Sequence, residues 1–304
     1  MPLATVIESA RPASLPPSPG ALSSVRLAAE AGRNALEASG DPGRIDMVIS
    51  AGVYRDEHIC EPAIAPLIQR HIPSLAHHGD VFAFDVANGA CGLVNALQVA
   101  DTFVRAGSIR RALIVASDVD PDSGRSEGLS LTPTGVGVVV GAGDGTEGFV
   151  AFHSETFTEH AGLHEARLEW LDVPSRRGRA KAHALSVRTD GAYAEHCTAC
   201  VATTARRFLD TQGLRIADVE LLIAPDAPPG LAGALPAALD IEPGRVSTDP
   251  GSRGTHSAAP GLALAAAIAR GRLREARRTL LVAVGAGITV ALALYGRTEA
   301  RRHA

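Results

Sequence analysis

NALEASGDPGRIDMVISAG (Asn34–Gly52) begins a pattern that occurs twice in the chain and that decides the fold. It continues in LQVADTFVRAGSIRRALIVAS (Leu97–Ser117). The second copy reads RFLDTQGLRIADVELLIAPD (Arg207–Asp226) and then LALAAAIARGRLREARRTLLVAV (Leu262–Val284). Each copy contains a helical segment, a glycine break, an acidic residue and an apolar run typical of a buried strand, and then a second helix, Arg-Arg and another buried strand.

The offset between the two copies is nearly constant. Asp46 and Glu220 lie 174 positions apart, and Arg110 and Arg277 lie 167 positions apart. An offset of this size indicates two copies of one layered α/β unit rather than a short-period solenoid. We expect an N-terminal half over residues 1–147 and a C-terminal half over residues 148–304, with the boundary near Gly145–Gly148.

The composition supports a globular α/β protein. The 304 residues suffice for a large core, and apolar residues make up 46% of them while aromatic residues make up only 4%. A net charge of −4 over the whole chain does not indicate a protein that binds nucleic acid. The sequence shows no apolar run long enough to span a membrane and no signal peptide, and four cysteines do not make a disulfide framework. We therefore expect a cytoplasmic protein.

The apolar runs and turn residues place the elements. A Pro-rich connector over Arg11–Gly20 and a polar, Arg-rich excursion over Pro174–Lys181 interrupt them. The strands expected in the first half are Leu3–Ala10, Met47–Gly52, Phe82–Ala87, Ala112–Ser117 and Gly135–Gly143. The helices expected are Ala21–Ser39, Glu61–His71, a segment from the turn at Asn88–Gly92 to about Arg105, and Tyr193–Phe208.

Cys91 is the most informative single residue. It follows an apolar strand and a glycine-containing turn, and it opens an apolar helix. The unpaired N–H groups and the dipole at a helix N-terminus stabilise a thiolate, which is the nucleophilic form of cysteine. The alternative is a small buried side chain at a tight turn. In contrast, Cys197 and Cys200 form a CxxC inside a predicted helix, which favours core packing, and we expect no metal site.

Several segments, in order, resemble the thiolase-fold condensing enzymes, especially the ketoacyl synthase III branch. FDVANGACGLVNAL (Phe84–Leu97) is similar to that family's nucleophile segment, and the resemblance covers most of the chain from about Ser24. The other segments that carry it are GVGVVVGAGDG (Gly135–Gly145), LLIAPDAPPG (Leu221–Gly230), GSRGTHSAAPGLAL (Gly251–Leu264) and LLVAVGAGITVALALYG (Leu280–Gly296). The resemblance implies a thiolase-like duplication of five layers, αβαβα, with pseudo-twofold halves.

The chain departs from the family at its catalytic positions. The resemblance implies Cys, His and Asn, but Asp226 stands where the family has His, and His256 occurs in the loop where the family has Asn. An ungapped alignment from Phe84 sets Ala90 against the family's cysteine. We favour a one-residue shift in the turn, because Cys91 still begins the helix.

Cys91, His256 and Asp226 make chemical sense as a different catalytic set. Decarboxylative condensation needs neutral hydrogen-bond donors for an enolate oxygen, which an ionised Asp226 would oppose. Instead, Cys91 would take an acyl group from a thioester, and His256 would deprotonate an incoming hydroxyl or amine. Asp226 would orient the imidazole. This set resembles the Cys-His-Asp acyltransferases of secondary metabolism. The alternatives are a polar strand end for Asp226 and a backbone-bonded loop histidine for His256.

The resemblance also suggests partners and the remaining site residues. The substrate is an acyl thioester of coenzyme A or of an acyl carrier protein, with no further cofactor. A carrier protein is a reasonable donor because the N-terminal region that holds the coenzyme A nucleotide in the family is short here, and the only tryptophan is Trp170. Gly285 and Gly287 are candidates for the oxyanion-hole backbone. We expect a homodimer.

Two other functions stay open at this stage. One is a carbon–carbon bond-forming 3-oxoacyl synthase III-like enzyme. The other is a catalytically silent thiolase-fold subunit that supports a partner synthase, which the shifted cysteine and the missing asparagine favour. The sequence does not identify the acyl chain, the acceptor or the pathway.

Overall fold

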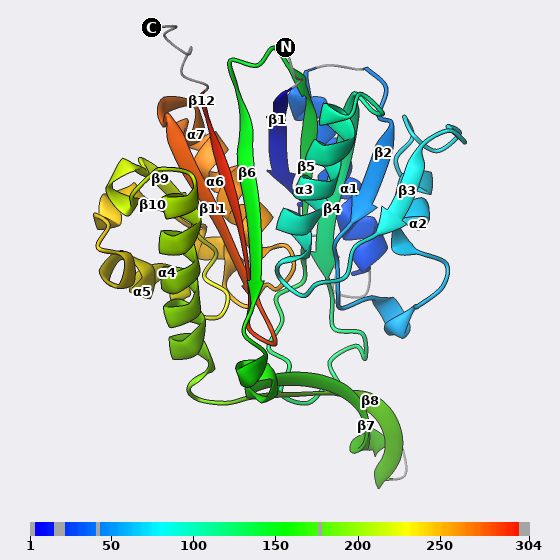
Figure 1. Cartoon of the computed structure of the whole chain (residues 1–304). Helices are drawn as coiled ribbons and strands as arrows, with labels where there is room; N and C mark the ends of the chain where they lie inside the picture. Colours follow the sequence, from blue (N-terminus) through cyan, green and yellow to red (C-terminus); the bar gives the residue numbers. More distant parts are fainter. Residues whose placement is uncertain (1–3, 15–21, 41–42, 176–177, 298–304) are drawn as a thin grey trace, which may run out of the picture.

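Two five-stranded sheets, each covered by helices on both faces, form the body of the protein in the computed structural model (Figure 1). The structure describes residues 4–14, 22–40, 43–175 and 178–297. The strands of the first sheet are β1 (Ala4–Pro12), β2 (Met47–Ser50), β3 (Phe82–Asp85), β4 (Arg111–Asp118) and β5 (Thr134–Gly143). Those of the second are β6 (Glu147–Thr156), β9 (Leu221–Ile223), β10 (Val246–Ser247), β11 (Arg278–Gly285) and β12 (Thr289–Arg297).

Helices fill the layers between and outside the sheets. The helices are α1 (Ser24–Ser39), α2 (Ile64–Arg70), α3 (Gly92–Arg105), α4 (Tyr193–Thr211), α5 (Leu231–Leu239), α6 (Ala259–Ala269) and α7 (Arg272–Glu275). Short 3₁₀ turns are η2 (Asp56–His58), η3 (Thr158–Leu163), η4 (Ile216–Asp218), η5 (Pro243–Arg245) and η6 (Pro250–Ser252).

The two sheets have the same topology. Read as β3-β2-β4-β5-β1 and as β10-β9-β11-β12-β6, both contain two parallel pairings followed by two antiparallel pairings. The strands at Phe82 and Leu221 lie in different sheets, as predicted. The pseudo-twofold duplication is confirmed.

The acidic residue that the repeat predicted makes the same contact in each half. The Asp46 carboxylate accepts hydrogen bonds from the backbone N–H groups of Arg110 (2.8 Å) and Arg111 (3.2 Å). The Glu220 carboxylate accepts one from the N–H of Arg277 (2.8 Å). Each carboxylate therefore fixes the entry of the strand that follows the Arg-Arg pair, which gives both halves the same sheet register.

Successive side chains of each strand point to opposite faces of its sheet, so the two sheets are bounded by three separate apolar clusters. One cluster lies between the sheets and one lies on each outer side, which gives five layers of helices and sheets. In β2, Met47 and Ile49 face the cluster between the sheets, whereas Val48 faces the cluster under α1 and α2. In β11, Leu281 faces the central cluster and Leu280 faces the cluster under α4 and α5. Helices α3 and α6 thus lie between the two sheets, and the predicted αβαβα order is confirmed.

The segment between β6 and α4 forms an antiparallel hairpin that extends away from the body (Figure 1). Its strands are β7 (His164–Ser175) and β8 (Gly178–Thr189), in continuous register from one end to the other. The sequence analysis described only a polar excursion over Pro174–Lys181, of which residues 176–177 lie outside the described residues. Apolar residues alternate with polar ones at Ala166, Leu168 and Trp170, but Leu168 and Trp170 remain exposed because most of this ribbon packs against no core.

Several predicted boundaries shift by a few residues. The first strand extends to Pro12 and the second helix begins at Ile64 rather than Glu61, after a cis Glu61–Pro62 peptide. The Pro-rich connector lies partly in residues 15–21, outside the described residues. None of the helices in the described part of the chain is long and apolar enough to cross a membrane.

Gly137 is expected to be essential for packing α1 on β5. A Cβ at this position would lie 2.5 Å from the carbonyl oxygen of Ala31, which is backbone and cannot rotate away. We predict that Gly137→Ala lowers the free energy of unfolding by about 2–3 kcal/mol, as measured by urea denaturation. Gly233→Ala is the control, because a Cβ there would meet nothing within 4 Å. Equal stability of the two variants would contradict this account of the packing.

Candidate functional site

A partly open cavity of about 230 Å³ lies where the carboxyl ends of the parallel strands from both sheets converge. In α/β proteins such strand ends are the usual place for ligands. The residues that line the cavity are Tyr54, Ala90, Gly128, Leu129, Ser130, Leu131, His164, Val187, Thr189, Tyr193, Asp226, Ala227, Pro228, Pro229, Gly254, Thr255, His256 and Val284. Both halves of the chain and the root of the β7–β8 hairpin contribute to its wall.

Asp118, at the end of β4, holds two walls of this cavity together. The side chain is fully buried. One carboxylate oxygen accepts hydrogen bonds from the N–H groups of Val53 (3.0 Å) and Tyr54 (2.9 Å). The other accepts from the N–H (2.8 Å) and the hydroxyl (2.5 Å) of Ser257. The loop after β2 and the loop before α6 are therefore fixed by one carboxylate.

His256 precedes Ser257 and lines the cavity. Its ring packs against the ring of Tyr54, with centroids 5.0 Å apart. A Cβ on Gly89 would lie 4.0 Å from His256 Nε2 and 3.9 Å from the Cα of Gly285, so the imidazole lies beside the turn that begins α3. Burial lowers the pKa of His256 below its usual value, and the Asp118 carboxylate opposes this shift only in part. His256 is therefore a neutral imidazole at neutral pH.

Cys91 begins α3, as predicted, but its thiol belongs to the core between the sheets. The residue has no exposed surface, and its Sγ donates a hydrogen bond to the carbonyl oxygen of Thr289 at 3.1 Å. Burial raises the pKa of the Cys91 thiol to about 12, although backbone groups of Ala291 and Gly285 act to lower it. In this environment desolvation outweighs the stabilisation of the thiolate by the helix N-terminus.

Ala90, the residue before Cys91, lies in the cavity wall. The ungapped comparison of the sequence set this alanine against the family's cysteine, whereas the sequence analysis favoured a one-residue shift. The structure places Ala90 at the surface of the cavity and the Cys91 side chain behind it.

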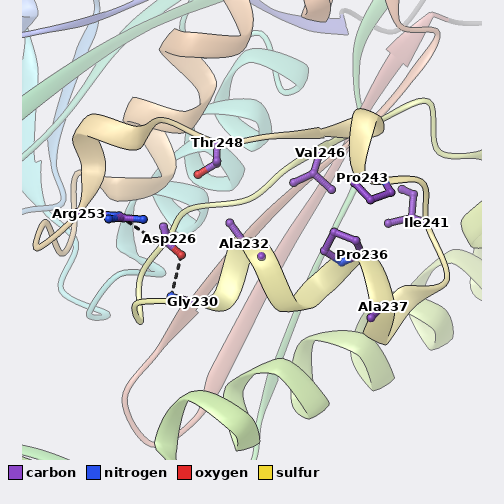
Figure 2. Close-up of a pocket in the computed structure, with 11 residues that line it drawn as sticks. Asp226, Gly230, Ala232, Pro236, Ala237, Ile241, Pro243, Val246, Thr248 and Arg253 are labelled. Carbon is purple, nitrogen blue, oxygen red and sulfur yellow. Dashed lines mark hydrogen bonds and ion pairs between the residues drawn. The ribbon is translucent and has the colours of Figure 1, made fainter.

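Asp226 lies in the wall of the same cavity as His256, but its observed partners are elsewhere. One carboxylate oxygen accepts the N–H of Gly230 (2.8 Å) at the start of α5, and the other lies 3.8 Å from Nε of Arg253 (Figure 2). The described residues contain no hydrogen bond between Asp226 and His256. The structure thus brings these two predicted residues to one cavity without joining them.

A second and more open groove, of about 740 Å³, also has Asp226 in its wall (Figure 2). It runs between α5 and the segment that follows it, with Pro236 and Val246 among its apolar side chains. Among the described residues, Asp226 alone lines both this groove and the cavity that contains His256. The carboxylate therefore stands at the boundary between them.

The glycines predicted for an oxyanion hole lie near Cys91. A Cβ on Gly285 would lie 3.6 Å from Cys91 Sγ and 3.5 Å from the backbone nitrogen of Ala90. Gly287 has a φ of 85° in the turn between β11 and β12. This turn therefore approaches the start of α3 closely, at the edge of the cavity.

Sequence reasoning missed His164 and Tyr193, which also line the cavity. They come from the ends of the hairpin and of α4, and their rings stack with centroids 5.2 Å apart. Sequence reasoning also missed Asp118 and Tyr54. A polar residue at the end of a buried strand is a signal that could have identified Asp118, but no local pattern identifies His164. Only the unpredicted hairpin places it here.

The remaining cysteines carry no evidence of a metal site. Cys197 and Cys200 are buried in α4 and pack in the cluster under the second sheet, as the sequence analysis favoured. Among the described residues, no group of three or more His, Cys, Asp or Glu side chains is arranged to hold a metal ion.

Comparison with known proteins finds relatives of this chain among the 3-oxoacyl-[acyl-carrier-protein] synthases III. Residues 209–296 match the family described as 3-oxoacyl-[acyl-carrier-protein (ACP)] synthase III C terminal. The chain is 30% identical to a β-ketoacyl-[acyl-carrier-protein] synthase III of Allorhizobium ampelinum, over 86% of this chain and 81% of that protein. It is 28% identical to the enzyme of that name from Actinobacillus pleuropneumoniae, over 88% and 82%. A crystal structure of 3-oxoacyl-(acyl carrier protein) synthase III from Pseudomonas aeruginosa shares the fold, with a TM-score of 0.76, 24% identity and coverage of 97% and 99%.

The thiol at position 91 is expected to resist alkylation in the native protein. With a pKa of about 12, only about one part in 10⁴ is thiolate at pH 8, and the sulfur has no exposed surface. Iodoacetamide should modify the exposed Cys60 and leave Cys91 unmodified, as read by peptide mass spectrometry. The matched variant Ala90→Cys should be alkylated at position 90, because Ala90 lines the cavity and Cys91 does not. Modification of Cys91 as fast as Cys60 would contradict the burial described here.

Proposed function

This chain belongs to the β-ketoacyl-[acyl-carrier-protein] synthase III family, and we propose that it transfers an acyl group from a thioester of coenzyme A or of a carrier protein to a hydroxyl or amine acceptor. The observation that carries the proposal is His256. A neutral imidazole in the wall of a cavity is suited to act as a general base toward an acceptor. Natural-product biosynthesis in the cytoplasm is the setting that we propose for this reaction.

The proposed chemistry balances without a cofactor. His256 removes the proton of the acceptor hydroxyl or amine as the acceptor oxygen or nitrogen forms a bond to the thioester carbonyl carbon. The bond from that carbon to sulfur then breaks, and the departing thiolate takes the proton. The products are an ester or amide and a free thiol. This direct route requires only that the acceptor and the thioester both bind in the cavity beside His256.

The route through a Cys91 acyl-enzyme requires a rearrangement. The thiol must leave the Thr289 carbonyl, turn toward the cavity and lose its proton before it attacks the thioester. Gly285 lies next to the sulfur and, with Gly287, would offer backbone N–H groups to the oxyanion. This route keeps the predicted sequence of acylation followed by transfer to the acceptor.

Asp226 is proposed to act on the base or on the acceptor. Its second carboxylate oxygen, 3.8 Å from Arg253, accepts no hydrogen bond within the described residues. An acidic oxygen in the cavity wall is suited to accept a hydrogen bond from His256 or from the acceptor. A decarboxylative reaction gains nothing from it, because a carboxylate opposes an enolate oxygen.

Intact mass spectrometry after incubation with acetyl-CoA and with acetyl-N-acetylcysteamine tests the proposal, with ethanolamine added as a probe acceptor that carries both a hydroxyl and an amine, and with thiol release followed in parallel. Thiol release without added mass supports the direct route, and an acetyl group on Cys91 supports the acyl-enzyme route. His256→Ala should lower transfer by ~10²–10⁴-fold. Activity should fall as the pH drops through the lowered pKa of His256, below about 6.5, because the base must be unprotonated.

A second candidate is a catalytically silent subunit of a partner synthase. The position of Ala90 in the cavity wall favours it, since an alanine offers no nucleophile there. Absence of both thiol release and acyl mass in the wild type would support this candidate and reject acyl transfer. Carbon dioxide release from malonyl-CoA would instead indicate carbon–carbon bond formation.

A homodimer through the edge of the first sheet is also proposed. β3 pairs with β2 on one side only, and Phe82 on it is 53% exposed and packs against Phe84 with ring centroids 4.7 Å apart. An unpaired edge with exposed aromatic rings is a template for a second copy. We predict that Phe82→Glu is monomeric by light scattering. Val150→Glu, at an equally exposed position on β6, should remain dimeric, and a monomeric wild type would contradict the proposal.

A further inference from the structure

His164 is a second imidazole in the wall of the cavity, contributed by the first residue of β7. Its Nδ1 lies 2.9 Å from the hydroxyl oxygen of Thr189 on the opposite strand of the hairpin. The ring also stacks on Tyr193 at an interplanar angle of 23°. Two contacts thus fix the orientation of this ring, and within the described residues Nε2 has no hydrogen-bond partner.

The fold fixes His164 from a second direction. The hairpin root is hydrogen-bonded to the loop before β5, whose residues 128–131 also line the cavity. The N–H of Glu127 donates to the carbonyl of Leu185, and the N–H of Val187 donates to the carbonyl of Glu127 (both 2.8 Å). Gly128, with a φ of 70°, follows directly, and a Cβ there would lie 2.1 Å from the carbonyl oxygen of Val187. The wall that carries His164 is therefore closely packed rather than a free arm.

The geometry points to His164 as a catalytic residue whose Nε2–H donates a hydrogen bond to the thioester carbonyl oxygen and to the oxyanion that forms on it. This inference rests on the proposed acyl transfer and adds a residue to it. This assignment requires the Thr189 hydroxyl to donate to Nδ1, so that the proton lies on Nε2. No covalent bond to His164 forms and its proton stays in place, so the bonds formed and broken in the proposed transfer are unchanged.

The electrostatic surroundings are consistent with a neutral donor. Burial lowers the pKa of His164, and the nearby His256 ring acts in the same direction. The other titratable groups on the cavity wall are Tyr54, Tyr193 and Asp226. The pKa of Tyr54 is raised to about 12 by burial and by Asp118, so that phenol stays neutral. The carboxylate of Asp226 cannot donate a hydrogen bond to an oxyanion, and a neutral imidazole at position 164 would supply such a donor in the same cavity.

Nuclear magnetic resonance of ¹⁵N-histidine-labelled protein tests the inference without turnover. His164 and His256 signals are assigned from His164→Gln and His256→Gln. We expect His164 to be the Nε2–H tautomer in the free protein, and its Nε2 signal to shift when acetyl-N-acetylcysteamine is added. Thr189→Ser should keep this tautomer, whereas Thr189→Val should lose it. An Nδ1–H tautomer, or an Nε2 signal unmoved by saturating thioester, would overturn the assignment.

Kinetics of thiol release from acetyl-CoA, with ethanolamine as the acceptor, supply the second readout. His164→Ala should lower kcat by ~10²-fold with little change in KM, as for loss of one oxyanion donor, and His164→Gln should recover most of it because its amide keeps an N–H. His160→Gln, outside the cavity wall, is the matched control. The acid limb of the pH profile should persist in His164→Ala, and its disappearance would make His164 the base instead. Unreactive wild-type protein would reject acyl transfer, while the spectra would still decide the role of His164.

Discussion

The buried carboxylate of Asp118 is the constraint on which the site depends. A fully buried charge is tolerated only when hydrogen bonds replace water, and four donors from two loops surround this one. Those loops carry Tyr54 and His256, whose rings pack on each other. The position of the proposed base is therefore set by a residue that does not touch the cavity. The same carboxylate joins β4 of the first sheet to the loop before α6 of the second half.

Desolvation separates the roles of the two residues that the sequence singled out. Burial disfavours the charged form of any group, so it lowers the pKa of His256 and raises that of Cys91. For an imidazole the result is a free base, and for a thiol it is a protonated and unreactive group. One physical effect thus favours chemistry that begins at the histidine. It leaves the cysteine dependent on a rearrangement.

The duplication of the fold does not extend to the site. The two sheets, their pairings and the contacts of Asp46 and Glu220 repeat, because they serve strand register in each half. The cavity lies between the halves and takes different side chains from each. A hairpin present in one half only adds His164 and Thr189, so the functional asymmetry comes from a segment outside the repeat.

The sequence by itself determined the five layers and the order of the elements that repeat in the two halves, but not the β7–β8 hairpin between them. Buried strands are recognised from local runs of apolar residues, and in this chain the same run occurs at equivalent positions in both halves. Cys91, His256, Asp226 and the glycine-rich turn all come to one region, because strand ends converge in such folds.

Only the tertiary structure decided which of these side chains face the cavity. A shift of one residue in the turn before α3 decides whether Ala90 or Cys91 lines the cavity, and no local sequence pattern indicates which of them does. The partners of Asp226 and the contribution of His164 depend on segments that are distant in sequence. Side-chain orientation and burial are properties of the packed interior. They therefore fix the pKa of each group, and with it the chemistry that the site can perform.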